Sequence, residues 1–360
     1  MLTVLRSVQL RAGTGSDRAK TPCGVQWPRS VKPRYGTPKA QGASRNEAFL
    51  RWGRYRIHYF FGDNGITSSE TTALQATVAL TRFHEPDALL EAALTSMSAQ
   101  VDIVAEVLLL DQTPSTVIAA LCRELDSATI RFRYAAIPAT SLSFARNLAI
   151  DRATAPVILF MDADAVAEPD WARSLYDALR VEHVGMVGSR ILPSWHRRPL
   201  LISKSLVVRD QYSIFDFGTQ TFPFHRVVGT AFGLHRERLD REAYFDEGLG
   251  RREGSLLGGE ETDLSRRVRR LGLDILYAGG AVVRHQILPA RISYFWILRR
   301  FFYAGVTRAL LGGPPAPSGA MNLWDYLVLP IVLPPYVVGY FVGRGNVRSR
   351  SSVRTDVRYR

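Results

Sequence analysis

The stretch Val157-Ile158-Leu159-Phe160-Met161-Asp162-Ala163-Asp164 decides the fold class. Five consecutive apolar residues without a polar interruption are typical of a strand that is buried on both faces. Two aspartates follow directly, at the point where that strand ends. The stretch therefore predicts an inner strand of a covered sheet, with two carboxylates at its carboxyl end.

Short apolar runs alternate with helical patterns on both sides of this strand. This alternation predicts an α/β fold, with a doubly wound, mostly parallel sheet covered on both faces. In such sheets ligands bind beyond the carboxyl ends of the strands. We expect strands at 76–80, 105–110, 129–134, 157–161, 275–277 and 281–283, and helices at 86–100, 115–125, 142–153, 169–181 and 260–271. Between 187 and 260 the pattern loosens into loops and aromatic residues.

The composition, the hydropathy pattern and the charge along the chain predict four segments. Residues 1–70 are expected to be a disordered basic extension, 71–288 the α/β domain, 289–343 an amphipathic and hydrophobic membrane-associated segment, and 344–360 a basic tail. Within the third segment, 292–311 predicts an amphipathic helix. Residues 323–342 are apolar over nearly the length needed to cross a bilayer.

That apolar run contains Asp325, Pro330, Pro334 and Pro335, which disfavour a straight spanning helix. A single crossing would also separate the basic tail from a domain that must stay cytoplasmic. We therefore expect a re-entrant or interfacial segment, or two crossings if 292–311 also inserts. A packed helix of the soluble body is the alternative.

The net charge of +13 lies at the two ends of the chain. Residues 1–57 hold 12 Lys and Arg against 2 Asp and Glu, and 344–360 hold 6 against 1, which leaves −2 for the body. A nucleic-acid-binding domain carries its charge on the folded face, so that class is excluded. Basic tails suit anionic lipid headgroups instead. The two cysteines, Cys23 and Cys122, form neither a disulfide framework nor a thiolate zinc site.

Three groups of polar residues are candidates for chemistry. Asp162 and Asp164 offer the hard oxygen ligands that Mg²⁺ or Mn²⁺ needs to bridge a diphosphate, although carboxylates also cap strand ends routinely. Glu260 and Glu261 follow two glycines and open a helix, either as a well-capped surface turn or as a general base. His285 ends the last strand, as a metal ligand or as a structural residue.

These residues, from Ala76 to Gly312, resemble the family 2 glycosyltransferases. The motifs that carry the resemblance are Val78-Ala79-Leu80-Thr81-Arg82-Phe83-His84-Glu85, Asp111 at the end of the second strand, Ala145-Arg146-Asn147, Phe160-Met161-Asp162-Ala163-Asp164, Gly229-Thr230-Ala231, Phe245-Asp246-Glu247 and Gly259-Glu260-Glu261-Thr262-Asp263-Leu264. The resemblance implies a GT-A fold, with a Rossmann-like nucleotide-binding half and an acceptor half.

The resemblance also assigns roles. Thr81, Glu85 and Asp111 would hold the nucleoside, Asp162 the ribose or the metal, Asp164 the metal, Arg146 the base or the diphosphate, and His285 would complete the metal site. The family's usual catalytic aspartate is replaced here by Glu261, which is the first choice for the base, with Glu260 second. The implied reaction is inverting transfer of one sugar, from a nucleotide sugar with Mn²⁺ or Mg²⁺. The acceptor would be a hydroxyl of a glycan, a lipid-linked acceptor or a polysaccharide, at the cytoplasmic face of the cell membrane.

Two other functions fit a similar fold. A sugar-phosphate nucleotidylyltransferase should have a glycine-rich loop after its first strand, and Thr81-Arg82-Phe83-His84-Glu85 has no glycine. A catalytically silent, membrane-associated binding protein is disfavoured by the intact carboxylates. The processive signature Gln-x-x-Arg-Trp is absent around 296–302, which favours transfer of a single sugar. The aromatic residues between 195 and 245 either stack on sugar rings or fill a core.

Overall fold

The computed structural model describes residues 47–52, 55–60, 74–313 and 321–356, in two compact units. In the first unit, β1 (Glu47–Trp52) and β2 (Tyr55–Phe60) form an antiparallel hairpin. Sequence analysis missed this hairpin, which falls inside the stretch predicted to be disordered. The rest of that stretch, and the last four residues of the basic tail, lie outside the described residues.

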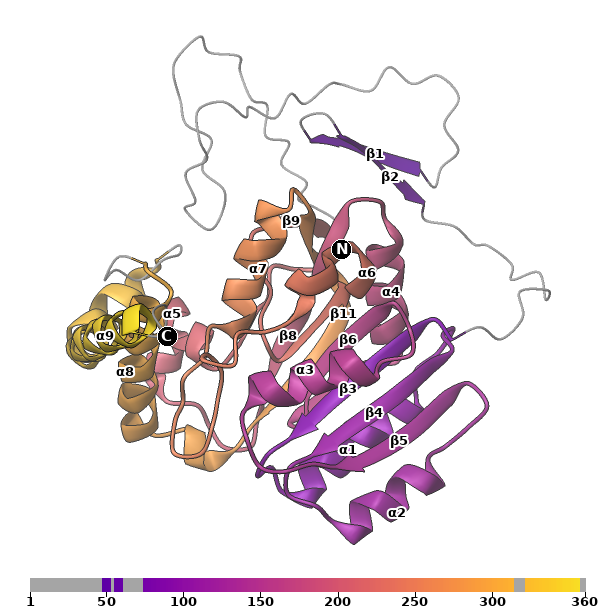
Figure 1. Cartoon of the computed structure of the whole chain (residues 1–360), viewed down its shortest axis with the longest axis horizontal. Helices are drawn as coiled ribbons and strands as arrows, with labels where there is room; N and C mark the ends of the chain where they lie inside the picture. Colours follow the sequence, from indigo (N-terminus) through magenta and orange to yellow (C-terminus); the bar gives the residue numbers. More distant parts are fainter. Residues whose placement is uncertain (1–46, 53–54, 61–73, 314–320, 357–360) are drawn as a thin grey trace, which may run out of the picture. The chain divides into compact units, whose positions relative to one another are not determined.

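The second unit is built on a nine-stranded sheet of order β5-β4-β3-β6-β10-β8-β11-β7, with β9 beside β11 (Figure 1). The strands are β3 (Ala76–Arg82), β4 (Ala105–Asp111), β5 (Ile130–Ala136), β6 (Val157–Asp162), β7 (Ala165–Ala167), β8 (Val184–Trp195), β9 (Thr221–Phe224), β10 (Ala231–His235) and β11 (Asp274–Ile287). The pairings give β5, β4, β3, β6, β8 and β11 one direction, whereas β10, β7 and β9 run against it. The predicted α/β, mostly parallel sheet is confirmed.

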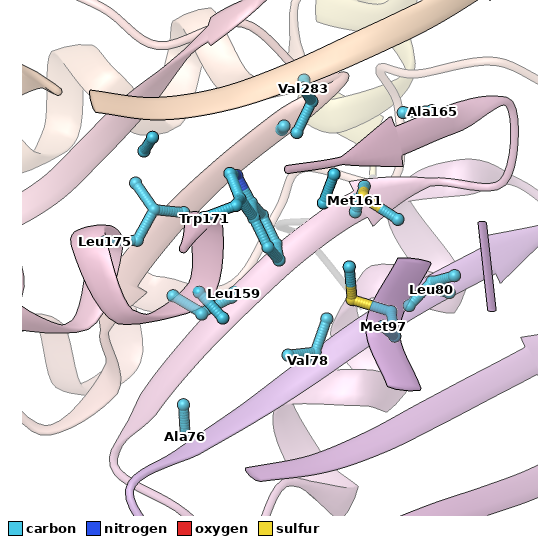
Figure 2. Packing of buried hydrophobic residues seen from close by; sticks show 14 of the residues in the cluster. Ala76, Val78, Leu80, Met97, Leu159, Met161, Ala165, Trp171, Leu175 and Val283 are labelled. Atoms are coloured by element: carbon cyan, nitrogen blue, oxygen red, sulfur yellow. The ribbon is translucent and has the colours of Figure 1, made fainter. Parts of the chain in front are cut away.

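Helices cover both faces of this sheet because its inner strands are apolar on both. The helices are α1 (Asp87–Ser98), α2 (Thr116–Glu124), α3 (Leu142–Arg152), α4 (Trp171–Arg180), α5 (Leu206–Gln211), α6 (Arg236–Leu239), α7 (Glu260–Arg270), α8 (Tyr294–Leu310) and α9 (Leu323–Asp356), with short 3-10 turns at Leu201–Lys204, Asp240–Ala243 and Pro289–Arg291. On one face α1, α2 and α4 pack against Val78 and Leu80. On the other face α3 and α7 pack against Ala79. Figure 2 shows the first core, where Met97 and Trp171 reach the strands.

Two inner strands were missed by the sequence analysis because small residues interrupt their apolar pattern. Strand β8 contains Gly185 and Gly188, and β10 contains Gly233. A Cβ at Gly233 would lie 2.7 Å from Leu159 and 2.8 Å from Leu179, and one at Gly185 would lie 2.9 Å from Val268. These glycines therefore let helices on both faces approach the sheet closely. The two short strands expected near 275–283 are one strand, β11, with a register shift between Ala278 and Val282.

The C-terminal helices α8 and α9 pack against each other and against α5. Asp325, fully buried, accepts hydrogen bonds from the Ser205 hydroxyl at 2.5 Å, the Val207 amide at 3.0 Å and the Asn322 amide at 2.6 Å. The carboxylate that disfavoured a membrane span is thus satisfied inside the protein. Leu323–Gly345 is apolar and long enough to cross a membrane by length and composition, with 33% of its most apolar window buried.

Glycines set the contact between α8 and α9. A Cβ on Gly339 would overlap the Phe302 backbone, and one on Gly305 would overlap the Tyr336 carbonyl. Gly345, on the same helix, has no neighbour within 4 Å of a Cβ. The helices can therefore lie this close only while both contact positions lack a side chain.

We predict that Gly339→Ala lowers the free energy of unfolding by about 1–3 kcal/mol, because the added methyl forces the helices apart. The matched control Gly345→Ala should be neutral, or stabilise by up to about 1 kcal/mol through helix propensity. Urea unfolding followed by tryptophan fluorescence measures both. Equal effects of the two substitutions would contradict the close helix contact.

Candidate active site

The carboxyl ends of the parallel strands meet at one edge of the sheet and form a cleft. The register pairs Thr81 with Asp162 across β3 and β6, and Arg82 with Asp111 across β3 and β4. The cleft has a volume of about 270 Å³. Its lining residues are Thr81, Arg82, Phe83, His84, Glu85, Gln112, Leu142, Asp162, Ala163, Asp164, Arg251, Arg252, Gly254, Ser255, Leu256 and Arg299. Four of the predicted site residues therefore face one cavity.

Arg146 joins the two acidic groups that are distant in the sequence. Its guanidinium donates to Glu260 Oε1 at 2.9 Å and to Asp162 Oδ1 at 3.1 Å, and it also donates to the Gly229 carbonyl at 2.8 Å. Arg146 is 1% exposed and lies over the rings of Phe232 and Phe245. Arg146 thus links Asp162, at the end of β6, to Glu260, at the start of α7.

The position of Arg146 differs from the expected donor contact. It does not line the cleft, and its donors are occupied by protein oxygens. A Cβ at Gly229 would lie 3.3 Å from the Arg146 guanidinium, so the absence of a side chain at this position leaves room for the arginine. In this structure Arg146 orients the carboxylates of Glu260 and Asp162 and does not line the cleft. Direct contact of Arg146 with the nucleotide-sugar donor stays a prediction.

The adjacent glutamates at the start of α7 have different environments. Glu260 is 3% exposed and bound to Arg146, and its Oε2 has no hydrogen-bond partner. Glu261 is half-buried, and burial together with the neighbouring Glu260 charge raises the pKa of Glu261 to about 7. A carboxylate with this pKa accepts a proton near neutral pH, whereas Glu260 is already engaged by Arg146. The geometry therefore favours Glu261 over Glu260 as the base.

Asp164 and His285 lie side by side because β7 pairs with the end of β11. The Gln286 amide donates to the Asp164 carbonyl at 2.8 Å, and the His285 Nε2 lies 3.5 Å from Asp164 Oδ2. The Arg291 guanidinium contacts the same Oδ2 at 2.8 Å. Burial alone would raise the pKa of Asp164, but the charge of Arg291 holds it well below its usual range.

These two residues fit part of a divalent cation site. Among the residues that the structure describes, no group of three or more His, Cys, Asp or Glu side chains is placed to hold a metal. Asp164 and His285 supply two ligand atoms, and Mg²⁺ in such sites takes its other ligands from water and substrate phosphates. Asp162 is held by Arg146, and burial raises its pKa despite that charge.

The residues that sequence analysis assigned to nucleoside binding fall into two groups, those that line the cleft and one that is buried. Thr81 and Glu85 line the cleft, and Glu85 Oε2 accepts from the Phe83 amide at 2.8 Å. Asp111 is fully buried behind them, where it accepts from Arg82 at 3.4 Å and from the Tyr134 hydroxyl at 3.1 Å. Nucleoside contact by Asp111 stays a prediction, and it requires one of these partners to move.

Two cleft arginines were missed by the sequence analysis. Burial would lower the pKa of Arg251, but the charges of Asp162, Asp164 and Glu260 raise it above its usual value. Arg299, from α8, lines the cleft and donates to the Gly254 carbonyl at 2.7 Å. Its signal was present in the sequence, where Arg299 interrupts the apolar face of the 292–311 helix.

The aromatic residues between β8 and β10 pack on one another and on the sheet. Phe215 is 2% exposed, and its ring lies 5.5 Å from that of Tyr277. Strand β9 pairs with the beginning of β11, at the opposite end of that strand from His285. Of the two alternatives left open by the sequence, filling a core is the one that the structure shows for Phe215, Phe222 and Phe224.

Comparison with known proteins identifies the class. A family model described as Glycosyl transferase family 2 matches residues 77–241. A glucosyl-dolichyl phosphate glucuronosyltransferase of Haloferax volcanii is 24% identical over 176 residues, which are 47% of this chain and 55% of that protein. The chain thus spans about half the length of this curated relative.

Two solved structures share the general architecture. GalNAc-T7 with UDP, GalNAc and Mn²⁺ is 14% identical, over 68% of this chain and 51% of that one, with a TM-score of 0.48. A mannosyltransferase of Pyrobaculum calidifontis with GDP-Man and Mn²⁺ is 15% identical, over 80% of each chain, with a TM-score of 0.49. Likeness at this level carries no information about this chain's site.

The mostly parallel α/β sheet, with Asp162 and Asp164 in the cleft at its edge, agrees with the GT-A fold that the motifs imply. Within the chain, residues 77–241 match the glycosyl transferase family 2 model. The family predicted from the motifs is confirmed.

We predict that Arg146→Met destabilises the fold by about 3–5 kcal/mol, because the buried Glu260 loses its cation and the partly exposed Asp162 loses the same partner. Arg173→Met is the control, since Arg173 pairs with Asp177 on the exposed face of α4. That loss should stay below about 1 kcal/mol. Urea unfolding of both variants gives the comparison, and similar losses would show that the Arg146 contacts are not buried.

Proposed function

We propose that the protein is an inverting glycosyltransferase that transfers one sugar from a nucleotide sugar to an acceptor hydroxyl. The observation that carries this proposal is the pair of contacts by which Arg146 holds Asp162 and Glu260. They hold Glu260, at the start of α7, close to Asp162, which lines the cleft. A sugar bound there has a proton acceptor on one side and the diphosphate ligands on the other.

Glu261 acts as the general base in this proposal. Its carboxylate takes the proton of the acceptor hydroxyl, whose oxygen then bonds to the anomeric carbon. The bond from that carbon to the diphosphate oxygen breaks, and the nucleoside diphosphate leaves with the electron pair. A single displacement of this kind inverts the anomeric configuration, and it requires no carboxylate nucleophile.

The departing diphosphate needs positive charge around it. Arg251 and Arg299 line the cleft, and both present guanidinium donors suited to phosphate oxygens. Asp164 and His285 would hold a divalent cation, which supplies electrostatic stabilisation of the leaving group. Thr81 and Glu85 would bind the nucleoside at the other end of the cleft.

The base assignment predicts a defined pH dependence. Glu261 is active only when ionised, so kcat/KM should fall as the pH drops through about 7, the pKa to which burial and Glu260 raise it. Glu261→Gln should reduce transfer by about 10²–10⁴-fold while donor affinity stays unchanged. Rates of nucleoside diphosphate release and donor titrations measure the two effects.

Asp263→Asn is the matched control for that substitution. Asp263 lies in the same helical turn but pairs with Arg267 at 2.9 Å. It should keep both the transfer rate and the pH profile. Unchanged transfer in Glu261→Gln would exclude this residue as the base.

The acceptor side is proposed to face a membrane, with the domain on the cytoplasmic side. Helix α9 exposes one apolar stripe, whose members are Leu323, Tyr326, Leu327, Ile331, Val338, Phe341 and Val342, exposed by 46–72%. The opposite stripe, with Val328, Val332 and Tyr336, packs into the protein. An amphipathic helix of this kind lies in the interface of a bilayer, and a lipid-linked acceptor would then be within reach. The name of the curated relative is consistent with such an acceptor.

We predict that Leu327→Glu with Phe341→Glu lowers binding to anionic liposomes by about tenfold or more, because the stripe then carries two charges into the interface. Val117→Glu is the control, since Val117 is 67% exposed on α2. Flotation of the full chain measures the bound fraction. Undiminished flotation of the double variant would contradict docking through α9.

A further inference from the structure

The Arg291 guanidinium fills the point on which Asp164 and His285 converge. One of its nitrogens lies 2.8 Å from Asp164 Oδ2, and another lies 3.1 Å from the His285 Nε2. The Arg291 side chain is 19% exposed, whereas those of Asp164 and His285 are 4% exposed. Arg291 therefore contacts both ligand atoms and is the most exposed of the three side chains.

The His285 ring is oriented so that its free lone pair faces this point. Its Nδ1 lies 2.8 Å from the Tyr212 carbonyl, which can only accept a hydrogen bond, so Nδ1 carries the proton. Arginine has no acceptor, so its contact with Nε2 assigns the lone pair to that atom. A hydrogen bond from the distal ring nitrogen to a carbonyl is also how metal-binding histidines are oriented.

The spacing of the two ligand atoms also suits a small cation. They lie 3.5 Å apart, and neighbouring ligands of an octahedral ion at about 2.1 Å lie about 3 Å apart. The guanidinium sits within hydrogen-bond distance of both atoms, in the space that such an ion needs. A divalent ion can therefore bind only after Arg291 has left.

We propose that Arg291 is a positioning residue that holds this cation site closed until a nucleoside diphosphate arrives. Two charge-assisted hydrogen bonds are lost when the guanidinium leaves, and a metal ion alone offers it no new acceptor. A diphosphate does, because its oxygens match the planar donors of arginine. Divalent cation and nucleotide should then bind cooperatively, each strengthening the other by the same factor. This inference rests on the proposed nucleotide-sugar function and adds an order to its binding steps.

The test measures Mn²⁺ binding rather than turnover. Free Mn²⁺ is followed by electron paramagnetic resonance, without nucleotide and with UDP or GDP, after subtraction of the Mn²⁺–nucleotide complex measured without protein. The wild type should bind Mn²⁺ about tenfold tighter or more when the nucleotide is present. Arg291→Met should bind Mn²⁺ alone about tenfold tighter than the wild type, and should lose most of the enhancement by nucleotide.

Arg284→Met is the matched control. It removes the same charge from the residue next to His285, but the Arg284 side chain pairs with Glu168 at 2.9 Å. It should behave as the wild type, and Arg291→Lys, which keeps the charge, should fall between the wild type and Arg291→Met. The Arg291 carbonyl, which accepts from the Tyr212 hydroxyl at 3.1 Å, is retained in every variant.

The outcomes separate this inference from the proposed function. The inference would be overturned if the wild type and Arg291→Met bound Mn²⁺ with equal affinity in the absence of nucleotide. It would also be overturned if Arg291→Met and Arg284→Met increased the Mn²⁺ affinity by the same factor. Failure of UDP and GDP to bind any of the proteins, with or without Mn²⁺, would instead count against the nucleotide-sugar function. A tighter Mn²⁺ site in Arg291→Met would still stand in that case.

Discussion

One buried guanidinium holds the candidate site together. Arg146 comes from α3, Asp162 from the end of β6, and Glu260 from the start of α7, so three elements meet at a single side chain. Burial of a carboxylate such as that of Glu260 is costly unless it has a partner, and this arginine serves both Glu260 and the partly exposed Asp162. The sheet brings the strand ends to one edge, but the Arg146 contacts fix where α7 begins relative to them. The cleft depends on this interaction more than on any single residue that lines it.

The different roles of Glu260 and Glu261 follow from the contact between Arg146 and Glu260. Arg146 holds Glu260 beside Glu261, and burial together with the charge of Glu260 raises the pKa of Glu261. One glutamate is thereby engaged by an arginine, and the other has a raised proton affinity. A similar division holds on the donor side, where Arg146 binds Asp162 and leaves Asp164 to His285 and Arg291.

The sequence predicted the sheet well wherever strands are continuously apolar, as in β3, β4 and β6. It missed β8 and β10 because their glycines serve packing between layers and therefore break the apolar pattern. The acidic members of the site were found because their motifs lie at strand and helix ends, whose positions the fold determines. Arg251 and Arg291 were missed because arginines in loops and short turns carry no periodic signal, whereas Arg299 was visible only as an interruption of an apolar helix face. Their proximity to the carboxylates is purely tertiary, and so is the burial of Asp111 behind the cleft.

The central claim is that one base and one leaving group act on opposite sides of a single sugar. Its most direct test is the anomeric configuration of the product, measured by nuclear magnetic resonance after transfer from an α-linked nucleotide sugar. A single displacement by an acceptor deprotonated at Glu261 predicts a β-linked product. An α-linked product would require two successive displacements or a different mechanism, and would contradict the arrangement described for this cleft.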